Sequence, residues 1–257
     1  MIDRGLSGSV VVGSDGSPAS LAAERWASAH VASPEDVVVV DRRSDDVDIA
    51  VEALLDQADA SGAVAVVVGH EPRERFGAGL VGKTTTQLLQ AARCPVIIVP
   101  SGWDPSVTSG RPVAVGVGVA RGTRAAVEWI RGQLGLARDG LLLVHALGPR
   151  SLFRPDGWLD VVAYHLDASI VPSWIEQDLD DLAERIVGES GLDLDVDVLV
   201  GRGPTGSRLL EAAGTASLLV VGRGEPTFVR EHVMAPYLRR AITHAPCPIV
   251  VVPTSLP

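Results

Sequence analysis

The residues best suited to chemistry form a glycine-rich segment that ends in a lysine and a threonine. Gly77, Gly82, Lys83 and Thr84 match the pattern Gly-x4-Gly-Lys-Thr. In phosphate-binding loops of this pattern, backbone N–H groups surround the phosphates and the lysine reaches the outer ones. Such a loop begins directly where a strand ends, whereas the preceding apolar run ends at Gly69. The segment therefore predicts contact with an anion or nucleotide rather than NTP hydrolysis, with a surface loop and a coincidental match as the alternative.

The other residues that could do chemistry say less about the kind of site. Asp15 follows an apolar run and precedes an Ala-rich one, so it is suited either to contact a ribose or base, or to form the turn before a helix. The six histidines have no matched nucleophile, and no Ser-His-Asp arrangement is readable. His244 and Cys247 have a ligand-like gap, but two candidates do not make a zinc site. We expect no catalytic residue and no metal, with weak ATPase activity left open.

Composition and charge narrow the classes of partner. The chain has 257 residues, 46% of them hydrophobic, and a formal net charge of −10. An acidic chain does not suit a phosphate backbone or an anionic membrane surface. The apolar runs have strand length, and the first residues show no hydrophobic signal core. We therefore expect a cytoplasmic protein that binds neither nucleic acid nor membrane.

The chain repeats itself, and the repeat determines its expected organisation. Gly13 and Trp26 return as Gly116 and Trp129, both after 103 residues. Residues 66–100 return as 219–253 after 153 residues, with glycine, cysteine and two prolines in register. The second copy thus carries about fifty additional residues. The two tryptophans recur on a helical face, which favours packing over ligand stacking.

Each copy reads as alternating strands and helices. In the first copy we expect strands at 10–14, 37–40, 63–69 and 96–99 and helices at 19–31, 48–60 and 84–92; in the second, strands at 113–119, 141–145, 196–200, 218–221 and 249–252 and helices at 123–134, 174–187, 208–216 and 237–244. The strands are continuously apolar, as in a parallel sheet covered on both faces. The predicted fold is α/β, with two tandem doubly wound parallel-sheet domains, the first shortened by one strand and one helix.

The domain boundaries follow from the repeat. We expect a first domain at 1–100, a Ser-, Gly- and Pro-rich linker at 101–111, and a second domain at 112–257 with an aromatic insert at 149–173. The insert is suited to form a lid, a contact surface for a protein partner, or a loop that buries its own aromatic rings. Duplication predicts that each domain has its own sheet, so a single continuous sheet would count against it.

These landmarks together resemble the universal stress protein family, over essentially the whole chain. The resemblance implies a five-stranded parallel sheet of order 3-2-1-4-5 in the adenine nucleotide alpha hydrolase-like fold. It also implies a regulatory role in the stress response, dimerisation through the last strand, and ATP binding in some members. For this chain it implies a pseudo-dimer of the two copies, with a homodimer as a further possibility.

The ATP-binding members carry an Asp after the first strand and a loop of form Gly-x2-Gly-x9-Gly-Ser/Thr after the fourth. In the first copy the spacing is intact, although Pro72 stands in place of the second glycine, where it removes a backbone donor. The resemblance assigns the nucleotide contacts to Asp15, Gly69, Gly82, Lys83 and Thr84.

The second copy has lost the same motif. Gly118 replaces the Asp, Glu225 replaces the second glycine, and Ala235 and Pro236 end the motif. We therefore expect ATP or another nucleotide, if bound, in the first copy only. The alternatives are a nucleotide-free interaction scaffold and, less favoured, a P-loop-like ATP or GTP hydrolase.

Overall fold

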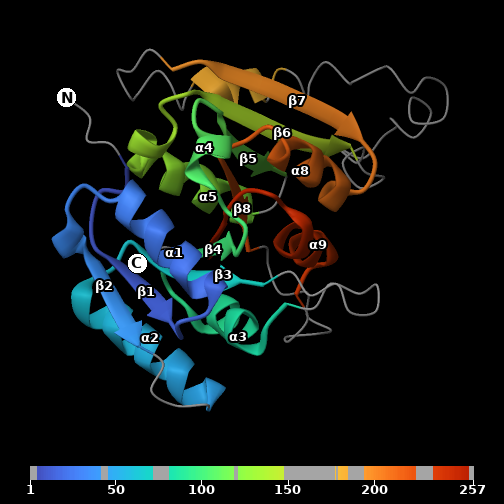
Figure 1. Cartoon of the computed structure of the whole chain (residues 1–257). Coiled ribbons are helices and arrows are strands. Elements are labelled where there is room, and N and C mark those ends of the chain that lie inside the picture. Colours follow the sequence, from blue (N-terminus) through green and yellow to red (C-terminus); the bar gives the residue numbers. More distant parts are fainter. Residues whose placement is uncertain are drawn as a thin grey trace.

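The computed structural model describes residues 5–41, 46–71, 81–118, 121–147, 177, 179–184, 194–223 and 234–254 (Figure 1). The first half of the chain contains β1 (Val10–Ser14), α1 (Pro18–His30), β2 (Val37–Asp41), α2 (Val47–Ser61), β3 (Ala65–His70), α3 (Lys83–Ala91) and β4 (Val96–Pro100). After α4 (Pro105–Thr108), the second half contains β5 (Val113–Val117), α5 (Arg121–Gly132), β6 (Leu141–Leu147), β7 (Val196–Arg202), α8 (Thr205–Ala213), β8 (Leu218–Gly222), α9 (Pro236–His244) and β9 (Ile249–Val252). Short 3-10 turns lie at Pro34–Asp36 and Leu134–Leu136. The alternation of strands and helices confirms the predicted α/β class.

The strands form one nine-stranded sheet of order β2-β1-β3-β4-β9-β8-β5-β6-β7. The expectation of a separate sheet for each copy is therefore wrong. Within each half the neighbouring strands are parallel, whereas β4 and β9, the last strand of each half, pair antiparallel. The continuous sheet thus arises from two parallel units that meet edge to edge, and no strand of one half is inserted into the other.

The register of the β4–β9 pair carries the signature of duplication. Ile97 lies opposite Val250, and these two residues are repeat equivalents, 153 positions apart. Val96 lies opposite Val251, which is the equivalent of Ile98. A pair centred on equivalent positions is self-complementary, as at the two-fold axis of a symmetric dimer. Both last strands have neighbours on both sides, so neither is open to a second chain.

The two halves differ at their outer ends, as the sequence predicts. From the joint outwards, the second half runs β9-β8-β5-β6-β7 and the first half runs β4-β3-β1-β2. No described strand of the first half corresponds to β7, so β2 is an edge strand, and Val39 is 46% exposed. A helix was predicted at 174–187, and the described part of this segment, residues 177 and 179–184, is helical. This confirms part of the prediction. The aromatic insert at 149–173 lies outside the described residues.

Helices cover both faces of the sheet and build one core on each. On one face α1 packs on the strands of the first half and α5 on β5, β8 and β9, and the equivalent Trp26 and Trp129 are 1% and 5% exposed in one shared cluster. Trp103, from the segment that joins the halves, is buried in the same cluster. The His30 ring stacks on Trp26, with 4.5 Å between centroids. The prediction that the two tryptophans pack in the core is confirmed, and the core they share unites the halves.

On the other face, α2, α3, α8 and α9 cover the strands. There Arg223, which follows β8, reaches across to the carboxyl end of α3 in the first half. Its Nη1 donates to the carbonyl oxygens of Leu89 at 2.8 Å and Gln90 at 3.2 Å. These carbonyls lie in the last turn of α3, where a cation meets the negative end of the helix dipole. Arg223 therefore ties the second half to α3.

Candidate functional site

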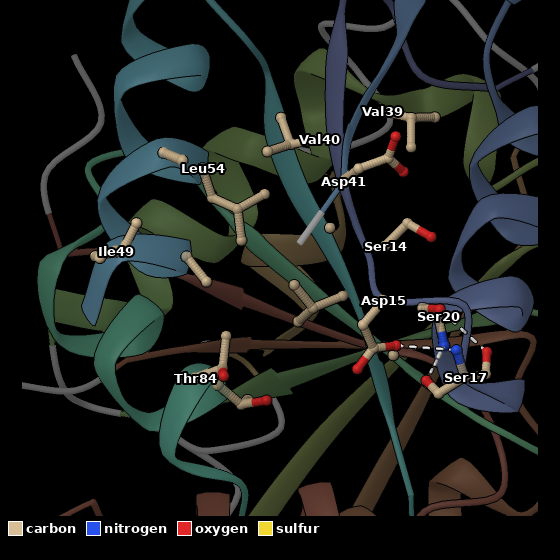
Figure 2. A pocket seen from close by; sticks show the side chains of 16 residues that line it. Ser14, Asp15, Ser17, Ser20, Val39, Val40, Asp41, Ile49, Leu54 and Thr84 are labelled. Atoms are coloured by element: carbon tan, nitrogen blue, oxygen red, sulfur yellow. Dashed lines mark hydrogen bonds between the residues drawn. The ribbon is translucent and has the colours of Figure 1, made fainter. Parts of the chain in front are cut away.

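A cavity of about 540 Å³ opens at the carboxyl ends of β1, β2 and β3 (Figure 2). Its walls are these strand ends together with parts of α1, α2 and α3. In open parallel α/β sheets, ligands bind in crevices outside the carboxyl ends of the strands. Three of the five residues predicted to contact a nucleotide line the cavity, namely Asp15, Gly69 and Thr84.

Asp15 lies in the turn from β1 to α1, which is one of the two roles that the sequence left open for it. Its Oδ1 accepts a hydrogen bond of 3.0 Å from the backbone N–H of Ser17, while Gly16 supplies a positive φ of 72°. Ser17 then caps α1, because its Oγ accepts from the N–H of Ser20. The exposed Asp15 thus shapes the turn and also contributes a carboxylate to the cavity wall.

Gly69 lies near the end of β3, where α1 passes over the sheet. A Cβ placed on Gly69 would lie 2.6 Å from the backbone N of Ser20 and closer still to the carbonyl group of Ala19. Real Cβ atoms do not approach backbone this closely, so the glycine permits the contact between β3 and α1. Sequence reasoning assigned Gly69 to phosphate binding and missed this packing role.

The other three residues predicted to contact a nucleotide lie at the start of α3, and only Thr84 lines the cavity. Gly82 precedes the helix without a side-chain cap, and Thr84 lines the cavity. Lys83 is not among the lining residues, and its Nζ lies 3.5 Å from Oδ1 of Asp48 at the start of α2. Gln87 also donates to Asp48, and this hydrogen bond, followed by the charge of Lys83, lowers the pKa of that carboxyl. Lys83, which was predicted to contact phosphate, thus lies beside the carboxylate of Asp48. Residues 72–80, which include Pro72, lie outside the described residues.

Sequence reasoning missed the apolar wall of the cavity. Val39, Val40, Ile49 and Leu54 line it from β2 and α2, and Ile49 is 56% exposed. Figure 2 shows Ile49 and Leu54 across the cavity from Asp15. The repeat held a signal for this wall, because the shorter first copy leaves β2 at the edge of the sheet, with no described counterpart of β7 beside it.

A tyrosine stands in the second half where the first half has a threonine that lines the cavity. Tyr237 occupies the position of Thr84, 153 residues later, and its hydroxyl donates to the carbonyl oxygen of Gly222 at 3.1 Å. Gly222 is itself the equivalent of Gly69. Burial raises the pKa of Tyr237, consistent with a ring packed into the fold. The sequence predicted an inactive second site from Gly118, which follows β5, and Glu225, which lies outside the described residues, but it missed the tyrosine.

A second substitution distinguishes the two halves. In the first half Ser14 pairs with Asp41, and in the second half the equivalent pair is Val117 with His145. His145 is 8% exposed, and its Nδ1 lies 3.0 Å from the carbonyl oxygen of Val117. Its Nε2 is buried without a hydrogen-bond partner among the residues described. Burial lowers the pKa of this imidazole below 6.5.

His145 makes stability depend on pH. Because its folded-state pKa is lowered, the unfolded chain takes up a proton near pH 6.5 that the folded chain takes up only at lower pH. The free energy of unfolding therefore falls as the pH drops below 6.5, by at most about 1.4 kcal/mol per pH unit for this residue. His30, whose pKa burial also lowers, adds to the wild-type slope. We expect His145→Gln to flatten the dependence of the thermal midpoint on pH; equal slopes in wild type and His145→Gln would contradict this.

The described residues were also compared with the requirements of a metal site and of a membrane-spanning helix. Over the described ranges, no group of three or more His, Cys, Asp or Glu side chains is arranged to hold a metal ion. Within the same ranges, no helix has both the length and the apolar character that crossing a bilayer requires.

Comparison with solved structures places this architecture among known ones. The crystal structure of a universal stress protein from Archaeoglobus fulgidus superposes with a TM-score of 0.60 and 14% identity, over 96% of this chain and 98% of that one. A functionally unknown protein from Pseudomonas aeruginosa gives a TM-score of 0.56 and 15% identity, over 96% of this chain and 82% of that one. At such identities the likeness concerns the fold.

Sequence comparison identifies the family as well as the fold. A universal stress protein of Mycobacterium tuberculosis is 26% identical over 208 residues, which are 78% of this chain and 68% of that protein. One of Mycolicibacterium smegmatis is 30% identical over 165 residues, which are 62% of this chain and 51% of that protein. The model of the universal stress protein family matches residues 32–100 and 111–253, consistent with two copies in tandem. Since these two segments make up most of the sequence, the chain belongs to the universal stress protein family.

Proposed function

We propose that this protein is a regulatory universal stress protein with one ligand site, in the first half, that takes a nucleotide-type ligand. The observation that carries the proposal is the asymmetry between equivalent positions: Thr84 lines an open cavity, whereas the larger Tyr237 donates its hydroxyl to the carbonyl oxygen of Gly222, the equivalent of the lining residue Gly69. The second half then serves as a structural partner for the first. Of the five predicted contact residues, the proposal retains Asp15, Gly69 and Thr84.

The dimensions and position of the cavity support this proposal. Its volume of about 540 Å³ lies within the range of roughly 300–1,000 Å³ typical of small-molecule sites. An apolar wall and a polar wall face each other, which suits a molecule with a ring at one end and hydrogen-bonding groups at the other. Thr84 and Thr85 bring the start of α3, with its unpaired N–H groups, to the same cavity.

Exchange of the two equivalent residues tests the assignment. Adenosine, AMP and ATP are titrated into the full chain by isothermal calorimetry, in parallel with thermal unfolding. We expect one site per chain for the best of the three and at least a tenfold loss of affinity in Thr84→Tyr, which copies the second half. Tyr237→Phe, the control, keeps the ring and is expected to bind as wild type does. Absence of binding by all three probes, or undiminished binding by Thr84→Tyr, would reject the proposal.

The β4–β9 joint favours a second candidate, an interaction scaffold without a ligand. A symmetric internal pairing gives the second half a structural role that needs no ligand, because it completes the sheet and shares the core. If the protein is such a scaffold, we expect no calorimetric signal and no thermal shift with any of the three probes. The same titrations therefore separate the two candidates.

A further inference from the structure

We infer that Arg223, a residue of the second half, positions α3 and thereby raises the affinity of the ligand site in the first half. The inference rests on the proposed function and deepens it, because it names the way in which the second half acts on that site. What carries it is a contact between the halves. Arg223 binds one end of α3, and the other end of the same helix lines the cavity through Thr84 and Thr85. Arg223 is thus a positioning residue, which acts on a ligand through α3.

The contact is made by one nitrogen of the guanidinium. Nη1 of Arg223 lies 2.8 Å from the carbonyl oxygen of Leu89, 3.2 Å from that of Gln90 and 3.4 Å from that of Ala92. The last carbonyls of a helix have no partner within it and carry the negative end of the helix dipole. A cation is therefore bound there by hydrogen bonds and by charge together. Arg223 closes the carboxyl end of α3 in this way.

The main chain at Arg223 is anchored to the sheet of the second half. The residue directly follows β8, and its backbone N–H donates to the carbonyl oxygen of Val252, the last residue of β9, at 2.7 Å. β9 in turn pairs with β4 across the joint. The sheet thus holds the main chain of Arg223 while its side chain holds α3, so the position of the helix end follows the second half.

The start of α3 has a different neighbour. Lys83 pairs with Asp48 at the start of α2, with side chains 64% and 65% exposed, and such exposed pairs contribute little to stability. Leu88 is buried beneath the helix. A helix of this length spans about 13 Å, so releasing its carboxyl end lets it tilt about the buried residues and moves Thr84 at the cavity. Displacements of about 0.5 Å are enough to weaken a pre-organised site.

The second half contains a matched contact at a helix away from the cavity wall. Nη1 of Arg111 donates to the carbonyl oxygen of Gly214 at 3.1 Å, at the carboxyl end of α8. Arg111 therefore caps a helix as Arg223 does, but none of the described residues that line the cavity belongs to α8. Comparison of the two arginines separates a change at the ligand site from a change in the stability of a helix.

Paired substitutions in the full chain test the inference. The dissociation constants of adenosine, AMP and ATP are measured by calorimetry, well below the thermal midpoint of every variant. We expect Arg223→Met, which keeps an unbranched side chain without the charge, to weaken binding of the best probe about five- to tenfold. Arg223→Lys, which keeps a cation, is expected to lose less. Arg111→Met is expected to bind as wild type does, even if its thermal midpoint falls as far as that of Arg223→Met.

Each outcome supports the inference or overturns it. Weaker binding by Arg223→Met, with a smaller loss in Arg223→Lys and none in Arg111→Met, supports it. Undiminished binding by Arg223→Met, or an equal loss in Arg223→Lys or Arg111→Met, overturns it and leaves the proposed function standing. If Arg223→Met does not fold, Arg223→Gln is judged by the same criteria. Failure of all three probes to bind the wild type refutes the proposed function, and the inference with it.

Discussion

Gly69→Ala is expected to destabilise the protein by about 3 kcal/mol, at the upper end of the usual cost of overpacking. The added methyl group would lie 2.6 Å from the backbone N of Ser20, and a backbone atom within a capped helix cannot move aside as a flexible side chain can. At roughly 2–4 °C per kcal/mol for a chain of this size, the thermal midpoint should fall by about 6–12 °C. Thermal unfolding followed by circular dichroism measures this directly.

Gly82→Ala provides the matched control, because the sequence assigned both glycines to the same loop motif. No atom of the described residues lies within 4 Å of a Cβ added at Gly82, and its φ of −57° suits any residue. We expect its midpoint to stay within about 2 °C of wild type, as for most substitutions away from tight packing. A Gly69→Ala protein as stable as Gly82→Ala would show that α1 does not depend on this close approach.

Val250→Asp is expected to have the largest effect of all, removing a large part of the stability of the folded chain. Val250 is fully buried opposite Ile97 at the centre of the β4–β9 pair. An unpaired charge in such a place costs about 3–5 kcal/mol, a large part of the 5–15 kcal/mol by which a domain is usually stable. The expected outcome is insoluble protein or loss of the near-ultraviolet signal of the buried tryptophans.

A milder variant keeps this prediction testable if the aspartate protein cannot be purified. Val250→Thr preserves the shape and buries one hydroxyl, and we expect it to lower the free energy of unfolding by about 1–3 kcal/mol. Val198→Asp and Val198→Thr make the same changes on the edge strand β7, where the side chain is 37% exposed, and should change stability far less. Similar losses at Val198 and Val250 would argue against the joint as a buried centre of the fold.

The sequence predicted the order of elements well because its signals were local. Continuous apolar runs such as Ile249–Val252 became strands with the predicted bounds, and the helix predicted at 19–31 is α1, Pro18–His30. Repeat offsets then located the shortened first half. These features depend on neighbours in sequence, which periodicity and capping preferences report directly.

What the sequence did not reveal depends on residues far apart in the chain. The joining of two sheets into one follows from the pairing of β4 with β9, which no local pattern specifies and to which only the family resemblance, through dimerisation by the last strand, pointed. Lys83 suited a phosphate by its place in a motif, yet the structure brings it to Asp48, a neighbour only in space. Tyr237 was unremarkable as a helical residue until its counterpart Thr84 was seen to line a cavity. Chemistry at the site was thus determined by tertiary contacts that motif spacing does not encode.

The β4–β9 pair also has a consequence for how the protein responds to dilution. Two separate chains joined through such strands would come apart as their concentration falls, and their melting temperature would follow it. Here both strands belong to one covalent chain, so their encounter is intramolecular at a fixed effective concentration. The nine-stranded sheet should therefore persist at any abundance of the protein in the cell.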